Sequence, residues 1–195
     1  METVSVDETY KKEIRKKTMK PLLWVAMVSI VMFFGGLTSA VIVSKPSGKW
    51  ISFAVPTPFY ISTIVILLSS LTYFFAIKYA KLNEFKKSYI FVWSTLVLGI
   101  VFTIFQYLGW KALYQQGIVF AGSESNRAGS YFYALTFLHL LHLIGGLISL
   151  LVVIIKLKRN KYTADDYLGM QVSATYWHFL DVLWVYLFVF LSYIA

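Results

Sequence analysis

The segment Tyr131–Ile155, YFYALTFLHLLHLIGGLISLLVVII, decides the fold class of this chain. Its 25 residues include no Asp, Glu, Lys or Arg. An α-helix needs about 20 consecutive apolar residues to cross a hydrocarbon core that is about 30 Å thick. The segment therefore predicts a transmembrane helix, because an uninterrupted apolar run of this length is not typical of a soluble protein.

Four further apolar segments have comparable length, namely Leu22–Val43, Pro58–Ile77, Ser88–Leu108 and Thr175–Ile194. The first segment is longer than a signal-peptide core of about 7–15 residues, so we expect it to remain as a span. We expect an all-α polytopic bundle of five transmembrane helices over residues 22–195. A polar, basic tail over residues 1–21 precedes it. Only 14% of the residues are charged, against about 25% in soluble proteins.

The 18 basic residues alternate between the two ends of the predicted spans. Six lie in the N-terminal tail, four between the second and third spans, and four between the fourth and fifth. The positive-inside rule then predicts a cytoplasmic N-terminus and an outer C-terminus. Short clusters beside membrane spans are unlike the gathered basic surface of a nucleic-acid-binding protein, so we expect no nucleic-acid partner despite the net charge of +9. The absence of cysteine excludes disulfides and thiolate metal sites.

Polar groups inside predicted spans are candidates for function. His139 and His142 lie on the fourth span, and His178 and Asp181 on the fifth, each pair with i, i+3 spacing. A metal or haem site built from the three histidines is one hypothesis. Two histidines so spaced on one helix cannot hold opposite faces of a haem. We favour hydrogen bonding across helices or contact with a partner subunit, and we predict no catalytic, cofactor-binding or metal-binding residue.

Asp181 is the one charged residue within a predicted span. Counted from Thr175 at about 1.5 Å per residue, it lies about 9 Å along the fifth helix. A charged Asp at the bilayer centre costs about 2.5–3.5 kcal/mol. We therefore expect it to be paired, hydrogen-bonded, protonated or turned toward another protein, with His178 as the nearest partner. The pairs Gly35-Gly36 and Gly145-Gly146 indicate close helix packing.

The fifth span contains Tyr176–Trp184, YWHFLDVLW, which resembles the Y-W-H-F-V-D-V-V-W signature of cytochrome oxidase subunit III. In the fourth span, Phe137–Gly146, FLHLLHLIGG, is similar to the F-H-G-L-H-V-I-x-G pattern of the same family. Two shorter fragments, Val31–Gly35 and Leu67–Ser70, agree in order. The resemblance extends from about Pro21 to the end of the chain and is to the short, five-helix form of the family.

The resemblance implies an accessory, cofactor-free subunit of a proton-pumping haem–copper terminal oxidase in the bacterial inner membrane. The complex reduces O₂ to water and carries haem and copper in partner subunits. Implied partners are the catalytic subunit I, the other oxidase subunits, phospholipids and a larger respiratory supercomplex. Implied roles are assembly, lipid binding and sustained proton uptake. The candidates for structural, interface or lipid-cleft roles are His139, His142, His178, Asp181, Trp177 and Trp184.

The chain departs from the family pattern at three positions that are often carboxylates, where it has Ile30, Gly109 and Gln171. A proton-handling role of those carboxylates is therefore not expected here. The electron donor of the complex, cytochrome c or quinol, stays open. An alternative function is a small membrane transporter or channel subunit. That function would need a polar lining along several spans, whereas only the fourth and fifth carry ionisable groups.

Overall fold

The computed structural model describes residues 2–45, 50, 52–121, 126–163 and 166–194. These residues form five α-helices: α1 (Glu2–Ser44), α2 (Thr57–Lys81), α3 (Phe85–Gln115), α4 (Arg127–Lys158) and α5 (Leu168–Ile194). Each helix contains a segment that is long and apolar enough to cross a membrane. The prediction of an all-α chain with five spans is confirmed.

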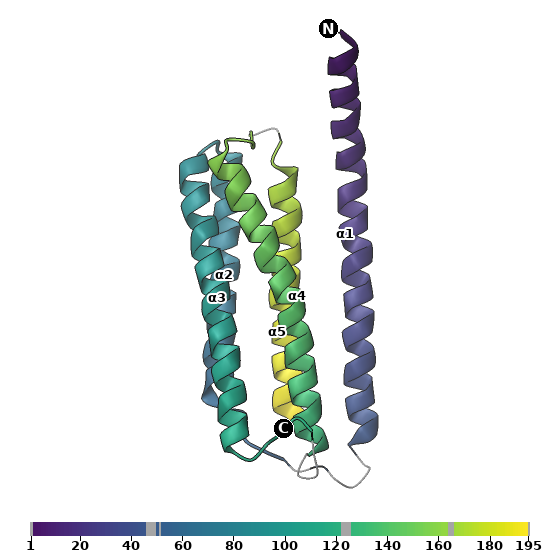
Figure 1. Ribbon diagram of the computed structural model, residues 1–195, viewed down its shortest axis with the longest axis vertical. Coiled ribbons are helices and arrows are strands. Elements are labelled where there is room, and N and C mark those ends of the chain that lie inside the picture. The colour runs from purple at the N-terminus through teal and green to yellow at the C-terminus, as the bar shows by residue number, and fades with distance from the viewer. Residues whose placement is uncertain (1, 46–49, 51, 122–125, 164–165, 195) are drawn as a thin grey trace.

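Helices α2 to α5 run antiparallel and form a four-helix bundle, in which α3 contacts α2 and α4, and α5 contacts α4 and α2. Helix α1 lies outside this bundle, as Figure 1 shows. Over the part of the chain that is described, α1 contacts α4 and α5 but neither α2 nor α3. Its N-terminal end projects well beyond the bundle (Figure 1).

The helices extend beyond the apolar segments that predicted them. Helix α5 begins at Leu168, seven residues before Thr175. The third predicted span ends at Leu108, whereas α3 continues to Gln115. Gly109 lies within α3 where the ring of Phe59 packs, and an added Cβ would lie 2.6 Å from that ring. The glycine therefore provides room for a neighbouring helix rather than a turn.

The first 21 residues were expected to form a separate tail. The backbone of α1 continues as one helix from Glu2 through Pro21 into the first span. Whether this segment behaves as a unit distinct from residues 22–195 stays a prediction.

Three helices end in the same way, and this keeps the connections between them short. The residue after the final turn has a positive φ at Asn83 (61°), Gly117 (79°) and Asn160 (49°). In each case the following amide donates to a carbonyl five residues earlier, over 3.0 Å. This is the Schellman geometry, which satisfies carbonyls at a helix end and favours Gly or Asn.

The buried faces of the bundle helices repeat every 3.5 residues. Alternating steps of three and four separate the buried residues of α2: Phe59, Ser62, Ile66, Ser69, Tyr73, Ala76 and Ala80. Helix α3 continues the pattern with Ser88, Val92, Thr95, Gly99, Phe102, Gln106, Gly109 and Leu113. This repeat is typical of left-handed helix packing. Many of these residues are small or polar, because helix association in lipid depends on close packing and hydrogen bonds.

Helix α5 supplies the large side chains that fill this narrow interior. Trp177 is fully buried and lies against Gly99 of α3 and Gly146 of α4. An added Cβ at Gly99 would lie 2.7 Å from Cη2 of the indole, and one at Gly146 would lie 3.1 Å from its Cε3. The indole Nε1 also donates to Oγ of Ser69 on α2 over 3.0 Å. One side chain of α5 thus contacts all three other helices of the bundle.

Trp184 repeats this arrangement two turns further along α5. Its Nε1 donates to Oγ1 of Thr63 on α2 over 3.0 Å. Its ring meets Phe102 of α3 edge-on, with centroids 5.1 Å apart, and lies 5.1 Å from the ring of His139 on α4. Both tryptophans therefore fix the rotation of α5 relative to its neighbours.

The Trp177 contact predicts that Gly99→Ala destabilises the bundle. The new methyl group would force the indole or a backbone to move, and overpacking of this kind costs about 1–3 kcal/mol. The matched control is Gly35→Ala, since an added Cβ at Gly35 meets nothing within 4 Å. The midpoint of thermal unfolding of the full chain in detergent should fall for Gly99→Ala and stay unchanged for Gly35→Ala. Equal midpoints would contradict this account of the contact.

Candidate functional site

Asp181 lies at the middle of α5, thirteen residues from both Leu168 and Ile194. At about 1.5 Å per residue, it is about 20 Å from either helix end. The expected position of about 9 Å along the helix was therefore too shallow, because α5 begins seven residues before Thr175. The only carboxylate within a predicted apolar span is consequently placed at the centre of its helix.

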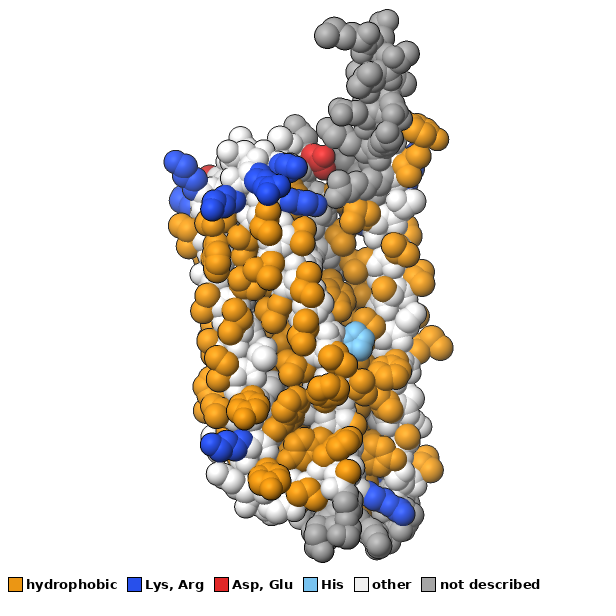
Figure 2. All heavy atoms as spheres, viewed as in Figure 1, with side chains coloured by type: hydrophobic (Ala, Val, Ile, Leu, Met, Phe, Trp, Pro, Cys, Tyr) orange, Lys and Arg blue, Asp and Glu red, His pale blue; other side chains and the backbone are white. Residues whose placement is uncertain are grey.

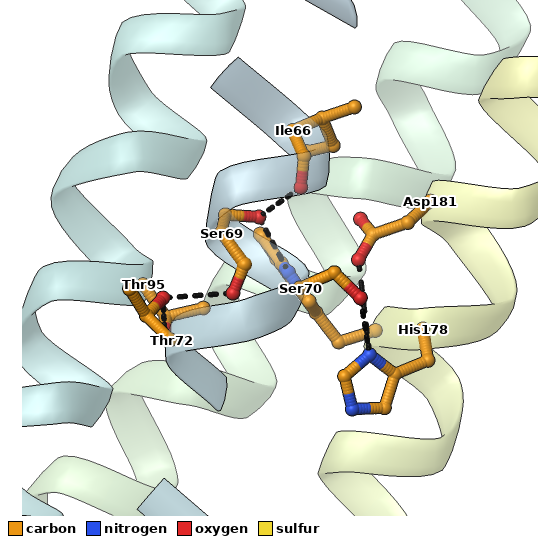
Figure 3. Close-up of polar contacts among 8 residues, drawn as sticks. Ile66, Ser69, Ser70, Thr72, Thr95, His178 and Asp181 are labelled. Carbon is orange, nitrogen blue, oxygen red and sulfur yellow. Dashed lines mark hydrogen bonds and ion pairs between the residues drawn. The ribbon is translucent and has the colours of Figure 1, made fainter. Parts of the chain in front are cut away.

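The carboxylate of Asp181 is buried, with 2% of the residue exposed. Neither carboxylate oxygen has a hydrogen-bond partner among the residues that are described. Nδ1 of His178 lies 3.9 Å from Oδ2 of Asp181, which is too long for a hydrogen bond. The same Nδ1 lies 2.7 Å from Oγ of Ser70 on α2. Figure 3 shows the carboxylate turned toward the Ser70 hydroxyl and the His178 ring.

This geometry makes Ser70 the link between α2 and the two polar residues of α5. If His178 carries its proton on Nδ1, it donates to Oγ of Ser70 and leaves the hydroxyl proton of Ser70 free. A rotation of that hydroxyl would direct its proton toward Asp181, which Figure 3 shows beside it. The group can therefore connect α5 to α2 through Ser70, in addition to the contacts of Trp177 and Trp184.

Other hydroxyl groups of α2 join the bundle in the same way. Ser69 accepts from Trp177. It also donates to the carbonyl of Ile66 over 2.8 Å (Figure 3). Thr72 and Thr95 pair their hydroxyls at 2.8 Å between α2 and α3 (Figure 3). The polar face of α2 thus connects the helices instead of lining an open passage.

The two histidines of α4 have different surroundings although they are only three residues apart. His139 is 1% exposed and lies between the rings of Phe102 and Trp184. Both of its ring nitrogens lack a hydrogen-bond partner within the described ranges. His142 is half-buried, and its Nδ1 lies 2.7 Å from the carbonyl of Leu138. Its ring packs edge-on against Phe34 of α1, with centroids 5.6 Å apart.

This division follows from helix geometry, because a step of three residues turns about 60° short of a full circle. His139 therefore reaches the bundle interior, whereas His142 reaches the boundary with α1. Within the part of the chain that is described, there is no group of three or more His, Cys, Asp or Glu residues that could hold a metal ion. The sequence hypothesis of one site built from His139, His142 and His178 has no support in this arrangement.

The three positions that depart from the family pattern lie in separate places. Ile30 is partly buried and packs against the core. Gly109 is buried beneath Phe59. Gln171 lies on the wall of a groove of about 410 Å³ between α1, α2 and α5, which His178 also lines. Sequence reasoning missed this groove because three segments that are distant in the chain build it.

Comparison with known proteins adds an independent observation. Residues 14–195 match the family described as "Cytochrome c oxidase subunit III". The chain is 31% identical over 180 residues to "Cytochrome c oxidase subunit 3" of Thermostichus vulcanus, covering 87% of this chain and 84% of the relative. It is 29% identical over 172 residues to the protein of that name from Corynebacterium diphtheriae, covering 84% and 82%.

A third relative, "Cytochrome c oxidase subunit 3" of Alkalihalophilus pseudofirmus, is 34% identical over 132 residues. That alignment covers 66% of this chain and 62% of the relative, so the chain spans less than two thirds of that protein. The family match nevertheless includes α2 to α5 completely and most of α1. It confirms the family that the residues of the fourth and fifth spans indicated. The chain belongs to the cytochrome c oxidase subunit III family.

Proposed function

We propose that this chain is the accessory, cofactor-free subunit III of a proton-pumping haem–copper terminal oxidase in a bacterial inner membrane. The family match over residues 14–195 is the observation that carries the proposal. In this role the chain performs no chemistry itself. It packs on the catalytic subunit, which with other partner subunits holds the haem and copper, and the complex can join a larger respiratory supercomplex.

The packing of the interior supports a structural role over transport. Trp177, Trp184 and Phe59 are fully buried and fill the space between the helices. Polar groups on α2 pair with groups on α3 and α5, as in the contacts of Ser69 and Thr72. A transporter would need polar groups that face a continuous passage. The bundle is therefore better suited to hold a shape against a partner than to conduct a solute.

We propose that the subunit sustains proton uptake by the catalytic subunit through positioning and lipid binding. Ile30, Gly109 and Gln171 cannot exchange protons as carboxylates do, so a relay through these positions is excluded. The proposed contribution is a bundle of stable shape, together with phospholipid held on its surface. Loss of this contribution would appear as a gradual loss of oxidase activity over many turnovers rather than as a slow first turnover.

We also propose that the N-terminus faces the cytoplasm. Figure 2 shows several Lys and Arg side chains at the end of the bundle from which the N-terminal part of α1 projects. Fewer appear at the opposite end of this face (Figure 2). The positive-inside rule associates the more basic end with the cytoplasmic side.

Cysteine labelling tests this orientation in a chain that has no cysteine of its own. Leu82→Cys and Lys161→Cys, both at exposed positions, should be protected from a membrane-impermeant thiol reagent in intact spheroplasts. Lys45→Cys and Gln116→Cys, exposed at the opposite end, should react. All four should react after permeabilisation, which serves as the control. The reverse pattern in intact spheroplasts would overturn the proposed orientation.

The polar group of α5 predicts that Asp181→Ala weakens retention of the subunit by the oxidase complex. Interhelical polar contacts in membranes contribute on average about 0.6 kcal/mol and at most about 1.7 kcal/mol. A change of this size shifts the equilibrium between the packed and the loosened bundle by about three- to twentyfold. A loosened bundle fits its partner less well and dissociates faster. Gel filtration in detergent measures retention, and oxygen consumption over many turnovers measures the working life. The haem spectrum and the initial turnover should stay nearly unchanged.

The control for this experiment is Ser94→Ala, because Ser94 is half-buried and, among the described residues, its hydroxyl bonds only to the carbonyl of Ile90 in its own helix. Removing His178 and Asp181 together should be milder than the sum of the single changes, since both act on the same contact. Abolished initial turnover in Asp181→Ala, with the subunit fully retained and the haems unchanged, would refute the structural role. A direct part in proton delivery would then replace it.

A further inference from the structure

Four buried side chains, one from each helix of the bundle, form a single layer across its interior. Nε2 of Gln106 on α3 donates to Oγ of Ser62 on α2 over 2.9 Å. The ring of Trp184 on α5 lies 5.1 Å from the ring of His139 on α4. Nε1 of Trp184 donates to Thr63, which directly follows Ser62 in α2, so the two pairs lie at the same height in the bundle. Each of the four side chains belongs to a residue that is at most 1% exposed.

The register between α3 and α4 places Gln106 and His139 at the same level. Nε1 of Trp110 on α3 donates to Oγ1 of Thr136 on α4 over 3.0 Å, so these two residues lie at one height. Gln106 precedes Trp110 by four residues, and His139 follows Thr136 by three. Because α3 and α4 run antiparallel, both steps lead about one helical turn in the same direction. The ring of Phe102, one turn from Gln106 on the same buried face, lies 6.1 Å from that of His139.

Three polar atoms of this layer are buried and unpaired. They are Oε1 of Gln106 and both ring nitrogens of His139, and no residue in the described part of the chain bonds to them. Buried polar atoms of native proteins are nearly always paired, either with another protein group or with an ordered water molecule. The layer therefore needs at least one further hydrogen-bonding group.

The side chains of the layer cannot supply that partner themselves. Trp184 donates its indole proton to Thr63. Ser62 donates its hydroxyl proton to the carbonyl of Phe59 over 2.8 Å. Turning the Gln106 amide over would exchange its oxygen and nitrogen, but the end directed away from Ser62 would still meet no partner among the described residues.

The chemistry of the layer limits what the partner can be. It must accept a hydrogen bond from an imidazole N–H and donate one to an amide oxygen. A cation would need acidic ligands, and the described residues include no group of three or more His, Cys, Asp or Glu that could hold a metal ion. An anion would need a permanent positive charge, which none of the four side chains carries. A small neutral molecule that both donates and accepts meets these requirements.

We propose that one water molecule is bound in this layer and bridges α3 and α4. It accepts a hydrogen bond from a ring N–H of His139 and donates one to Oε1 of Gln106, within the range of about two to four bonds that buried waters make. The bridge lies one turn from the direct bond between Trp110 and Thr136 and adds a second polar link between the same two helices. This water site goes beyond the proposed function, because it concerns the interior of the chain and needs no partner subunit.

The test uses the full chain in liposomes, with histidine labelled by ¹⁵N. The sequence contains three histidines, so the solid-state NMR spectrum has three imidazole side chains, and His139→Phe identifies the signals of His139. Polarisation is transferred from water protons to the ring nitrogens. A bound water predicts transfer to one ring nitrogen of His139, although this residue is only 1% exposed. Absence of transfer to both nitrogens in the wild-type chain would overturn the proposal.

A variant and a matched control locate the water in the layer. Gln106→Leu removes the amide acceptor but keeps a side chain of similar size, and it should abolish the transfer to His139. Gln171→Leu removes an amide that lies in the groove between α1, α2 and α5 instead of the layer, and it should leave the transfer unchanged. Unchanged ring signals of His142 show that each variant keeps its fold. Transfer that persists in a folded Gln106→Leu chain would refute the bridge, and if this variant does not fold, the wild-type measurement decides.

Discussion

The contact of Trp177 with three other helices is the interaction on which the rest of this structure depends. The indole lies against Gly99 and Gly146, which have no side chains to obstruct it, and donates its one proton to Ser69. Lipid gives helices no hydrophobic reason to associate, so they depend on such close fit and on hydrogen bonds. A large ring packed against two glycines supplies both the close fit and a hydrogen bond. It therefore fixes the rotation of α5 and its position along the bundle axis.

That placement determines where the polar residues of α5 lie. With Trp177 directed into the interior, His178 reaches Ser70 on α2 and Asp181 lies behind it, buried at the centre of the helix. Trp184, two turns further, then meets Thr63 and His139. The motif that identifies the family is therefore, in this chain, mainly a set of contacts between helices. Trp177, His178 and Trp184 each bond to a neighbouring helix, whereas the carboxylate oxygens of Asp181 have no hydrogen-bond partner among the described residues.

The outer helix has far fewer contacts of this kind, and its packing is correspondingly looser. Helix α1 touches only α4 and α5 over the described residues, and a groove that Lys20 and Lys81 line lies between α1 and α2. A tightly packed four-helix bundle with a more loosely attached outer helix can adapt to a partner surface without losing its own shape. This combination agrees with a role in the lifetime of an oxidase rather than in its chemistry.

The sequence by itself determined the number of spans and the family, and the tertiary structure decided how the spans meet. The length of an apolar run can be read from one segment. In lipid, a spanning helix satisfies its backbone groups within that segment, so a single run is enough to predict a span. The alternation of three and four that places Ser62 and Ser69 on one buried face was not predicted from the sequence. The early start of α5 at Leu168, the separation of His139 from His142 and the position of Ser70 beside Asp181 were not predicted either. These features depend on the fit between side chains from distant segments. The hydropathy of a single segment contains no information about that fit.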